Sequence, residues 1–288
     1  MKFTWWKAAL VQSYYHATLP YRATWRWQQA GVGRLPMVVL FYHRVAEDVS
    51  NPWTCSNRDF ERQMRWLKKH FDMLSLEEVQ QRVRSGRNDR PAVSITFDDG
   101  YSENCDYALP LLVDLGIPCT YFVSTRYVFD SLPFPHDLAR GQRFAPNTPE
   151  QIQAFARAGI EMGAHTRTHP DLGQINDPQR LHDEVVVAGE ELQTLVGRPI
   201  RYFAFPFGQH KNLNAQAFEL AHTVGFEGVC SAYGGVNFPG DDAFHIQRIA
   251  TDTELIRIKN RVTRPASRAD VERFEYEPCT ALLEPQRT

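Results

Sequence analysis

The chain has 288 residues, of which 43% are hydrophobic, 12% aromatic and 23% charged, and its 32 Lys and Arg against 34 Asp and Glu give a net charge of −2. This composition is too apolar and too rich in aromatic rings for a disordered chain, and the length suffices for one large domain or two small ones. A nearly neutral chain has no overall field that attracts a polyanion, so we expect no nucleic-acid partner.

Residues 1–34 form a basic, aromatic N-terminal segment. The first 46 residues hold six Lys or Arg and no acid, together with four of the six tryptophans, Trp5, Trp6, Trp25 and Trp27. An amphipathic helix that packs its rings on the domain would explain this composition. The alternative is a cationic, aromatic surface that makes peripheral contact with a membrane or binds a partner.

The sequence predicts no membrane-spanning helix. Its longest strongly apolar run, residues 37–42, is far shorter than the roughly 18 residues that cross a bilayer. Lys7 and several polar residues interrupt the N-terminus, so we expect no signal peptide. The five cysteines are scattered and contain no CxxC pair, which is typical of reduced thiols. We therefore expect a cytoplasmic protein or one peripheral to the membrane.

From Leu35 onward, short apolar runs alternate with stretches of helical period. Such alternation predicts a parallel sheet with right-handed crossovers, and at least six repeats favour a distorted or incomplete (β/α) barrel over an open doubly wound sheet. We expect this domain to span residues 35–262 and a polar surface tail to follow at 263–288. The expected strands are 37–43, 92–97, 119–124, 160–164, 202–205 and 228–232, the expected helices are 60–71, 76–83, 104–115, 149–158, 177–196 and 215–224, and 126–148 is a long irregular connection.

Two adjacent carboxylates, Asp98 and Asp99, follow the apolar strand 92–97 and precede Gly100. A turn at the glycine can direct both carboxylates toward one pocket at the carboxyl end of the strand, where sites gather in such folds. A metal bound to one would leave the other free as a base. The alternative is an ordinary turn in which one aspartate caps the next helix.

A pair of histidines, His165 and His169, follows the strand 160–164. Their spacing suits a metal, although such a pair alone is more often structural. Both this pair and the aspartates are predicted at the same end of the parallel strands. Two imidazoles and one carboxylate form a three-ligand site with open positions, which is the pattern of catalytic metal sites.

The strand 202–205 runs into Pro206, Phe207 and Gly208. The simplest interpretation is a core strand closed by a turn. The alternative is that Phe205, Pro206 and Phe207 line a pocket in which the apolar face of a sugar lies against the rings.

These three segments resemble the polysaccharide deacetylases with a NodB homology domain, carbohydrate esterase family 4. The first family motif, TFDDG, is unaltered at residues 96–100, and the second, His-[Ser/Thr]-x-x-His, is present at 165–169. The third departs from the common form, because Ala204 occupies the position of an arginine; FAFPFG at 203–208 is similar to the branch with an FAYPYG motif. That branch opens with a Tyr-His strand, matched by Tyr42 and His43, and closes with an Arg-Ile strand, matched by Arg248 and Ile249. The resemblance covers about residues 36–250 and implies a NodB-type barrel of seven to eight parallel strands.

The resemblance also implies roles for individual residues. Asp99, His165 and His169 would bind a divalent metal, most simply Zn²⁺, although cobalt, nickel, iron and manganese also suit these ligands. Asp98 would be the general base, and the backbone N–H of Tyr101 would help to hold the oxyanion.

The general acid and the base-orienting cation are less directly indicated. Many family members use a histidine in a late Leu-x-His motif, of which no unaltered copy is present. His245 and His43 are the two candidates for the acid. Arg248 is the candidate for the cation that replaces the missing arginine.

We therefore expect a metal-dependent hydrolase that removes N-acetyl groups from amino sugars of a polysaccharide or glycan. One alternative is an amide or imide hydrolase that acts on a small non-sugar molecule with the same site. The other is an inactive carbohydrate-binding protein of the same fold. The sequence leaves the oligomeric state open.

Overall fold

The computed structural model describes residues 5–270 and 272–277, and the side chains from residue 9 onward. The described strands alternate with helices along the chain. They are β1 (Met37–Tyr42), β2 (Arg44–Val45), β3 (Thr54–Cys55), β4 (Asp72–Leu74), β5 (Ala92–Phe97), β6 (Cys119–Val123), β7 (Glu161–Ala164), β8 (Tyr202–Ala204), β9 (Gly228–Cys230), β10 (His245–Ile246) and β11 (Ile249–Ala250).

Most of the helices lie between successive strands. They are α1 (Trp5–Gly31), α2 (Asn57–His70), α3 (Leu76–Arg84), α4 (Ala108–Leu115), α5 (Thr125–Asp130), α6 (Pro135–Leu138), α7 (Pro149–Arg157), α8 (Pro178–His182), α9 (Ala188–Val196), α10 (Ala215–Thr223) and α11 (Leu255–Thr263). A π-helical turn, Asp183–Val187, joins α8 to α9, so the helix expected at 177–196 is present but not regular. Short 3₁₀ turns occupy Ser102–Cys105, Leu172–Gln174, His210–Asn212 and Arg268–Asp270.

The sheet confirms the expected incomplete barrel. Its strands follow the order β10-β9-β8-β7-β6-β5-β1-β11, with β4 beside the first half of β5 and β6 beside the second half. Every strand pair is parallel. The two edge strands, β10 and β11, are joined in the chain by Gln247 and Arg248 alone. Arg248 therefore lies where the curled sheet comes closest to closing.

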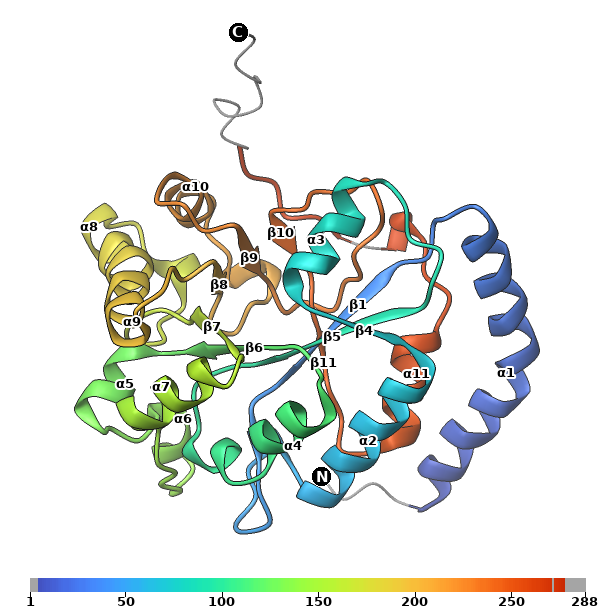
Figure 1. Ribbon diagram of the computed structural model, residues 1–288, viewed down its shortest axis with the longest axis horizontal. Helices are drawn as coiled ribbons and strands as arrows, with labels where there is room; N and C mark the ends of the chain where they lie inside the picture. Colours follow the sequence, from blue (N-terminus) through green and yellow to red (C-terminus); the bar gives the residue numbers. More distant parts are fainter. Residues whose placement is uncertain (1–4, 271, 278–288) are drawn as a thin grey trace, which may run out of the picture.

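Burial explains why the central strands read as continuous apolar runs. All residues of β1 and β5 are buried. Helices cover the outside of the sheet (Figure 1), and strands buried on both faces are apolar almost throughout. At the amino end of the strands, α3 packs Leu76, Val79 and Val83 against Met37 and Ala92. The amino end is thus filled by core residues, and the carboxyl end remains for a site.

The N-terminal segment forms one helix, α1, that lies beside α11 along one side of the molecule (Figure 1). Arg22 is buried and donates to Asn260 Oδ1 at 2.7 Å and to Thr263 Oγ1 at 2.9 Å. Trp25 is half-buried and Trp27 is 77% exposed, while the side chains of Trp5 and Trp6 lie outside the described part. No helix in the described residues is long and apolar enough to cross a membrane.

Part of the expected polar tail packs on the domain. Phe274 and Tyr276 stack on Phe218 of α10 with ring centroids 5.4 and 4.3 Å apart. Residues 278–288 of the tail, with Cys279, lie outside the described residues. The other four cysteines are free thiols.

Candidate functional site

The carboxyl ends of the strands surround a cavity of about 320 Å³. Asp98 and Asp99 reach it from the end of β5, and His165 and His169 from the loop after β7. The residues that line it are Phe41, His43, Trp53, Asp98, Asp99, His136, Arg140, His165, His169, Phe207 and Ala232. The structure therefore brings together the two motifs that the sequence placed at one end of the sheet.

Asp99, His165 and His169 converge on one point. One ligand atom from each lies within 4.8 Å of the others, and the Asp99 Oδ1 atom is 3.1 Å from His169 Nε2 and 3.5 Å from His165 Nε2. This Oδ1 atom is buried and accepts no hydrogen bond from any described residue. A buried carboxylate oxygen without a donor, facing two imidazole nitrogens, fits a divalent cation.

The backbone of the ligand loops is unusual. Asp99, Thr166 and His169 have positive φ angles of 75°, 61° and 55°, which L-residues adopt at a cost. Such strain persists only where the surroundings over-determine it, and it concentrates at functional sites. In this site it directs a strand-end aspartate and two loop histidines toward the same point.

The tautomer of His165 is set by its neighbour in the sheet. His165 Nδ1 lies 2.8 Å from the carbonyl oxygen of Ala204, at the end of β8. A carbonyl can only accept, so Nδ1 carries the proton and Nε2 presents a lone pair toward Asp99 Oδ1. This arrangement is typical of histidines that bind a metal through Nε2.

Glu184, in the π-helical turn, holds the loop that carries His169. Its Oε2 atom accepts from the backbone N–H groups of Arg167 and Thr168 at 2.9 and 2.8 Å, and its Oε1 atom accepts from the Thr168 hydroxyl. Glu184 is 5% exposed, so these bonds are sheltered from water. This residue could not be singled out from the sequence, because a glutamate within a helical stretch has no distinguishing pattern.

Asp98 forms a bidentate ion pair with Arg248. The two carboxylate oxygens are 2.6 Å from Nη1 and 2.9 Å from Nη2, and both side chains are buried. Burial raises the pKa of Asp98, but Arg248 and the imidazole of His165 outweigh it and hold that pKa below its ordinary value. Asp98 is therefore ionised and fixed in orientation. Arg248 occupies the place that the sequence analysis expected for a substitute cation.

The two candidate acids lie in different places. His43 is half-buried and lines the cavity with Asp98 and Asp99, and burial lowers its pKa despite the two carboxylates. His245 lies instead at a separate cavity of about 640 Å³, beside the C-terminal segment, with its Nε2 atom 2.9 Å from Ser231 Oγ. His245 is not among the residues that line the site, because its ring packs against that of Phe218 of α10, with 5.1 Å between the centroids.

The two phenylalanines after β8 have different surroundings. Phe207 is 54% exposed, lines the cavity and has its ring 5.1 Å from that of His169. Phe205 is 1% exposed and packs on Phe203 and Phe218, and Pro206 is buried. The expectation that Phe205 contacts a ligand is wrong for this geometry. Side chains alternate between the two faces of a strand, and that of Phe205 points toward Phe218 of α10.

A third histidine, His136 of α6, enters the site without a sequence signal. The Tyr101 hydroxyl is 2.7 Å from Asp137 Oδ2, 2.8 Å from His136 Nε2 and 3.2 Å from Trp53 Nε1. Its single proton goes to the Asp137 carboxylate, which can only accept, so His136 Nε2 and Trp53 Nε1 both donate to the Tyr101 oxygen. His136 Nε2 carries its proton in this arrangement and is not a free metal ligand. The Tyr101 side chain thus connects three neighbouring residues by hydrogen bonds. The prediction that an oxyanion binds here concerns its backbone N–H.

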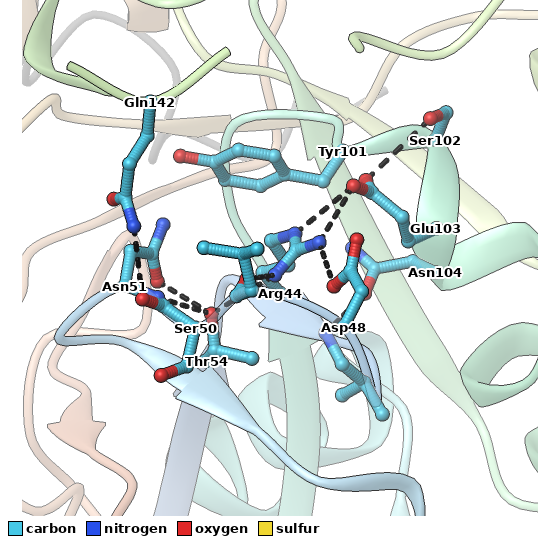
Figure 2. A network of polar contacts seen from close by, with 12 residues as sticks. Arg44, Asp48, Ser50, Asn51, Thr54, Tyr101, Ser102, Glu103, Asn104 and Gln142 are labelled. Carbon is cyan, nitrogen blue, oxygen red and sulfur yellow. Dashed lines mark hydrogen bonds and ion pairs between the residues drawn. The ribbon is translucent and has the colours of Figure 1, made fainter. Parts of the chain in front are cut away.

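A buried arginine ties together the loops around the cavity. Figure 2 shows the Arg44 guanidinium beside the carboxylates of Asp48 and Glu103. Its Nη2 atom donates to Glu103 Oε1 at 2.8 Å. Its Nη1 atom donates to Val49 O at 2.8 Å and to Thr54 Oγ1 at 3.2 Å. The loop between β2 and β3 is therefore fixed to the turn that follows Asp98 and Asp99.

Comparisons with known proteins agree with this geometry. The family model described as polysaccharide deacetylase matches residues 85–229, which is half of the chain. The YxkH protein of Bacillus subtilis (strain 168) is 25% identical over 191 residues, which are 66% of this chain and 62% of YxkH. A chitooligosaccharide deacetylase of Bradyrhizobium sp. (strain ANU 289) is 31% identical over 119 residues, or 41% of this chain and 46% of that protein. The chain thus spans about half to three-fifths of the length of these two relatives.

A solved structure shares the fold. IcaB from Ammonifex degensii superposes with a TM-score of 0.63 at 24% sequence identity, over 79% of this chain and 97% of that one. The family model covers the strand that carries both aspartates, the histidine loop and the strand that ends at Ala204. On the match over half of its length, the chain belongs to the polysaccharide deacetylase family.

Proposed function

We propose that this protein removes N-acetyl groups from amino sugars of a glycan, with a divalent metal held by Asp99, His165 and His169. The observation that carries the proposal is the buried Oδ1 atom of Asp99, which accepts no hydrogen bond from any described residue. This atom faces two imidazole nitrogens, and the ionised Asp98 is its neighbour in the chain. A bound divalent cation would supply Lewis acidity at the acetamide carbonyl and lower the pKa of a water in the site. Zinc is the expected ion, and the same ligands suit cobalt, nickel, iron and manganese.

The residues of the chain then divide the proton transfers between them. The Asp98 carboxylate, held by Arg248, accepts the proton of the water that attacks the acetamide carbon. The backbone N–H of Tyr101 is the proposed donor to the developing oxyanion. His43 gives a proton to the amine as the C–N bond breaks, so that acetate and a free amino sugar leave. Burial lowers the pKa of His43, which makes its protonated form a stronger acid toward that amine.

The cavity offers the surfaces that a sugar needs. Phe207 and Trp53 offer rings at its rim, and an apolar sugar face lies well against such rings. A glycan enzyme gains rate from sugars bound beyond the reacting one, because that binding energy can be used at the transition state. An amidase for small molecules would show no dependence on oligomer length.

The experiment is an assay of acetate release from N-acetylglucosamine oligomers of one to six sugars, with the metal content measured in parallel. We expect kcat/KM to rise with length and Asp98→Asn to lose about a thousandfold or more of kcat while it retains the metal. Full activity of Asp98→Asn would remove Asp98 as the base. Glycan binding without metal or turnover would favour an inactive carbohydrate-binding protein.

We also propose that the N-terminal helix makes a peripheral membrane contact. Leu10, Tyr14 and Tyr21 are exposed along one stripe of α1, in a segment that contains no acid. Flotation with vesicles of anionic lipid tests this proposal. Replacement of the three residues by serine should abolish flotation and leave acetate release unchanged, whereas unchanged flotation would contradict it.

A further inference from the structure

One wall of the cavity combines an aromatic ring with an arginine. Arg140, just after α6, lies over the ring of Trp53 with 4.7 Å between the guanidinium carbon and the ring centroid. Its Nη1 atom donates to the carbonyl oxygen of His136 at 2.8 Å. The contact with the ring and this bond hold the guanidinium beside Trp53, while its other nitrogens remain available to a ligand because the residue is exposed.

The charges of the cavity single out Arg140. Among its lining residues, the carboxylates are Asp98 and Asp99. Asp98 is paired with Arg248, and Asp99 faces two imidazoles. Within the part of the chain that the structure describes, Arg140 forms no ion pair with a carboxylate, so an arriving anion meets an uncompensated cation there and no free acid.

Hydrogen bonds between two loops hold this wall of the cavity in place. Asn51 Nδ2 donates to Asp137 Oδ1 at 3.1 Å, and Gln142 Nε2 donates to the carbonyl oxygen of Ser50 at 2.9 Å. Figure 2 shows Gln142 reaching down to the loop that holds Ser50 and Asn51. Trp53 follows on that same loop and donates to Tyr101. A preorganised wall loses little freedom when a ligand binds, so its contacts contribute more fully to affinity.

We propose that Trp53 and Arg140 form a subsite for a carboxylate-bearing sugar adjacent to the N-acetylated sugar that reacts. The proposal rests on the proposed function and narrows its substrate class to acidic glycans. Trp53 packs against the ring of the neighbouring sugar, and the Arg140 fork donates two parallel hydrogen bonds to its carboxylate. A uronic acid supplies both groups, and we use it as the probe.

The test compares two matched oligosaccharides. One alternates N-acetylglucosamine with glucuronic acid, and the other is the same oligomer with each carboxyl group reduced to the alcohol. We expect kcat/KM for acetate release to be about tenfold higher for the acidic oligomer, since a hydrogen bond to a charged group commonly contributes this much. The preference should shrink at high salt.

Variants on one loop make the test specific. Arg140→Gln should remove the preference, whereas Arg143→Gln, an exposed arginine three positions further on, should retain it. Turnover of both oligomers at equal kcat/KM, or an unchanged preference in Arg140→Gln, would overturn the subsite and leave the proposed function intact. If neither oligomer is turned over, the proposed function fails, and calorimetry with the wild-type protein decides the subsite. Tighter binding of the acidic oligomer that Arg140→Gln abolishes would then support it, and equal binding would overturn it.

Discussion

Arg248 and Asp98 lie 150 positions apart in the sequence and form a two-point ion pair beneath the candidate metal ligands. The arginine reaches Asp98 from the two-residue connection at which the curled sheet nearly closes. It also donates to Ser231 O at 3.0 Å and to Thr96 Oγ1 at 3.1 Å. The family position that commonly carries an arginine holds Ala204 here, whose carbonyl instead orients His165. The same carboxylate is therefore held from a different strand end.

Replacement of Arg248 by Met should lower both stability and activity. The change leaves Asp98 buried without its partner, and breaking a buried pair typically costs about 3–5 kcal/mol of the free energy of unfolding. Denaturant unfolding measures this loss. The double variant Arg248→Met with Asp98→Asn removes both charges and should recover part of it. Arg65→Met breaks an exposed pair with Glu61 and should change stability by less than about 1 kcal/mol. Equal effects of the two single variants would contradict the assigned role.

Replacement of Glu184 by Gln should weaken metal binding without removing a ligand. The carboxylate accepts two backbone N–H groups and one hydroxyl from the loop that carries His169, and an amide offers only one acceptor oxygen. Loss of such outer contacts typically costs about 10- to 100-fold in metal affinity. Competition with a chelator measures the affinity, and Glu190→Gln, exposed on the same helix, is the control. Unchanged metal affinity in Glu184→Gln would show that the loop with His169 keeps its conformation without these hydrogen bonds.

The barrel, and the convergence of the three candidate metal ligands at one end of it, could be predicted from the sequence because both depend on local signals. Buried parallel strands such as Ala92–Phe97 leave continuous apolar runs, and Asp99, His165 and His169 lie within five residues after a strand end. The strand β4 escaped detection because three residues are too few for any periodicity.

Other features could not be read from the sequence, because they arise between distant segments. His136 comes from the four-residue helix α6, and Trp53 and Arg140 come from irregular loops; the Tyr101 hydroxyl and the hydrogen bonds between the loops bring them together. His43 and His245 were equivalent as isolated histidines. Their surroundings in the fold separate them, since His43 lines the cavity beyond the carboxyl end of β1 and His245 packs against Phe218 of α10.

Replacement of Tyr101 by Phe should destabilise the protein. The Tyr101 hydroxyl donates to Asp137, a fully buried carboxylate, and accepts from two further groups. Hydrogen bonds to charged groups contribute about 1.5–3 kcal/mol each, so we expect a loss of about 2 kcal/mol in the free energy of unfolding. Metal content should stay unchanged, because the described hydrogen bonds of this hydroxyl go to Asp137, His136 and Trp53 and to none of the three candidate ligands. Tyr107→Phe, which removes a bond to the surface carboxylate of Glu61, is the matched control with a smaller effect. A similar loss in both variants would contradict a special role for Tyr101.

Replacement of His245 by Gln should weaken the pH dependence of the free energy of unfolding at acidic pH. Burial lowers the pKa of His245 from 6.5 to about 4, so between these values the unfolded chain binds a proton that the folded protein does not. Stability therefore rises with pH across this window, and the contribution of His245 is fully present above pH 6.5 and lost below about 4. At about 1.4 kcal/mol per pKa unit, the histidine accounts for about 3 kcal/mol of the change. Denaturant unfolding between pH 4 and 7.5 gives this dependence for the wild type and for His245→Gln, whose side chain can still bond to Ser231. The exposed His182→Gln should follow the wild-type curve. Parallel curves for the wild type and His245→Gln would show that the buried imidazole already takes up its proton in the folded state.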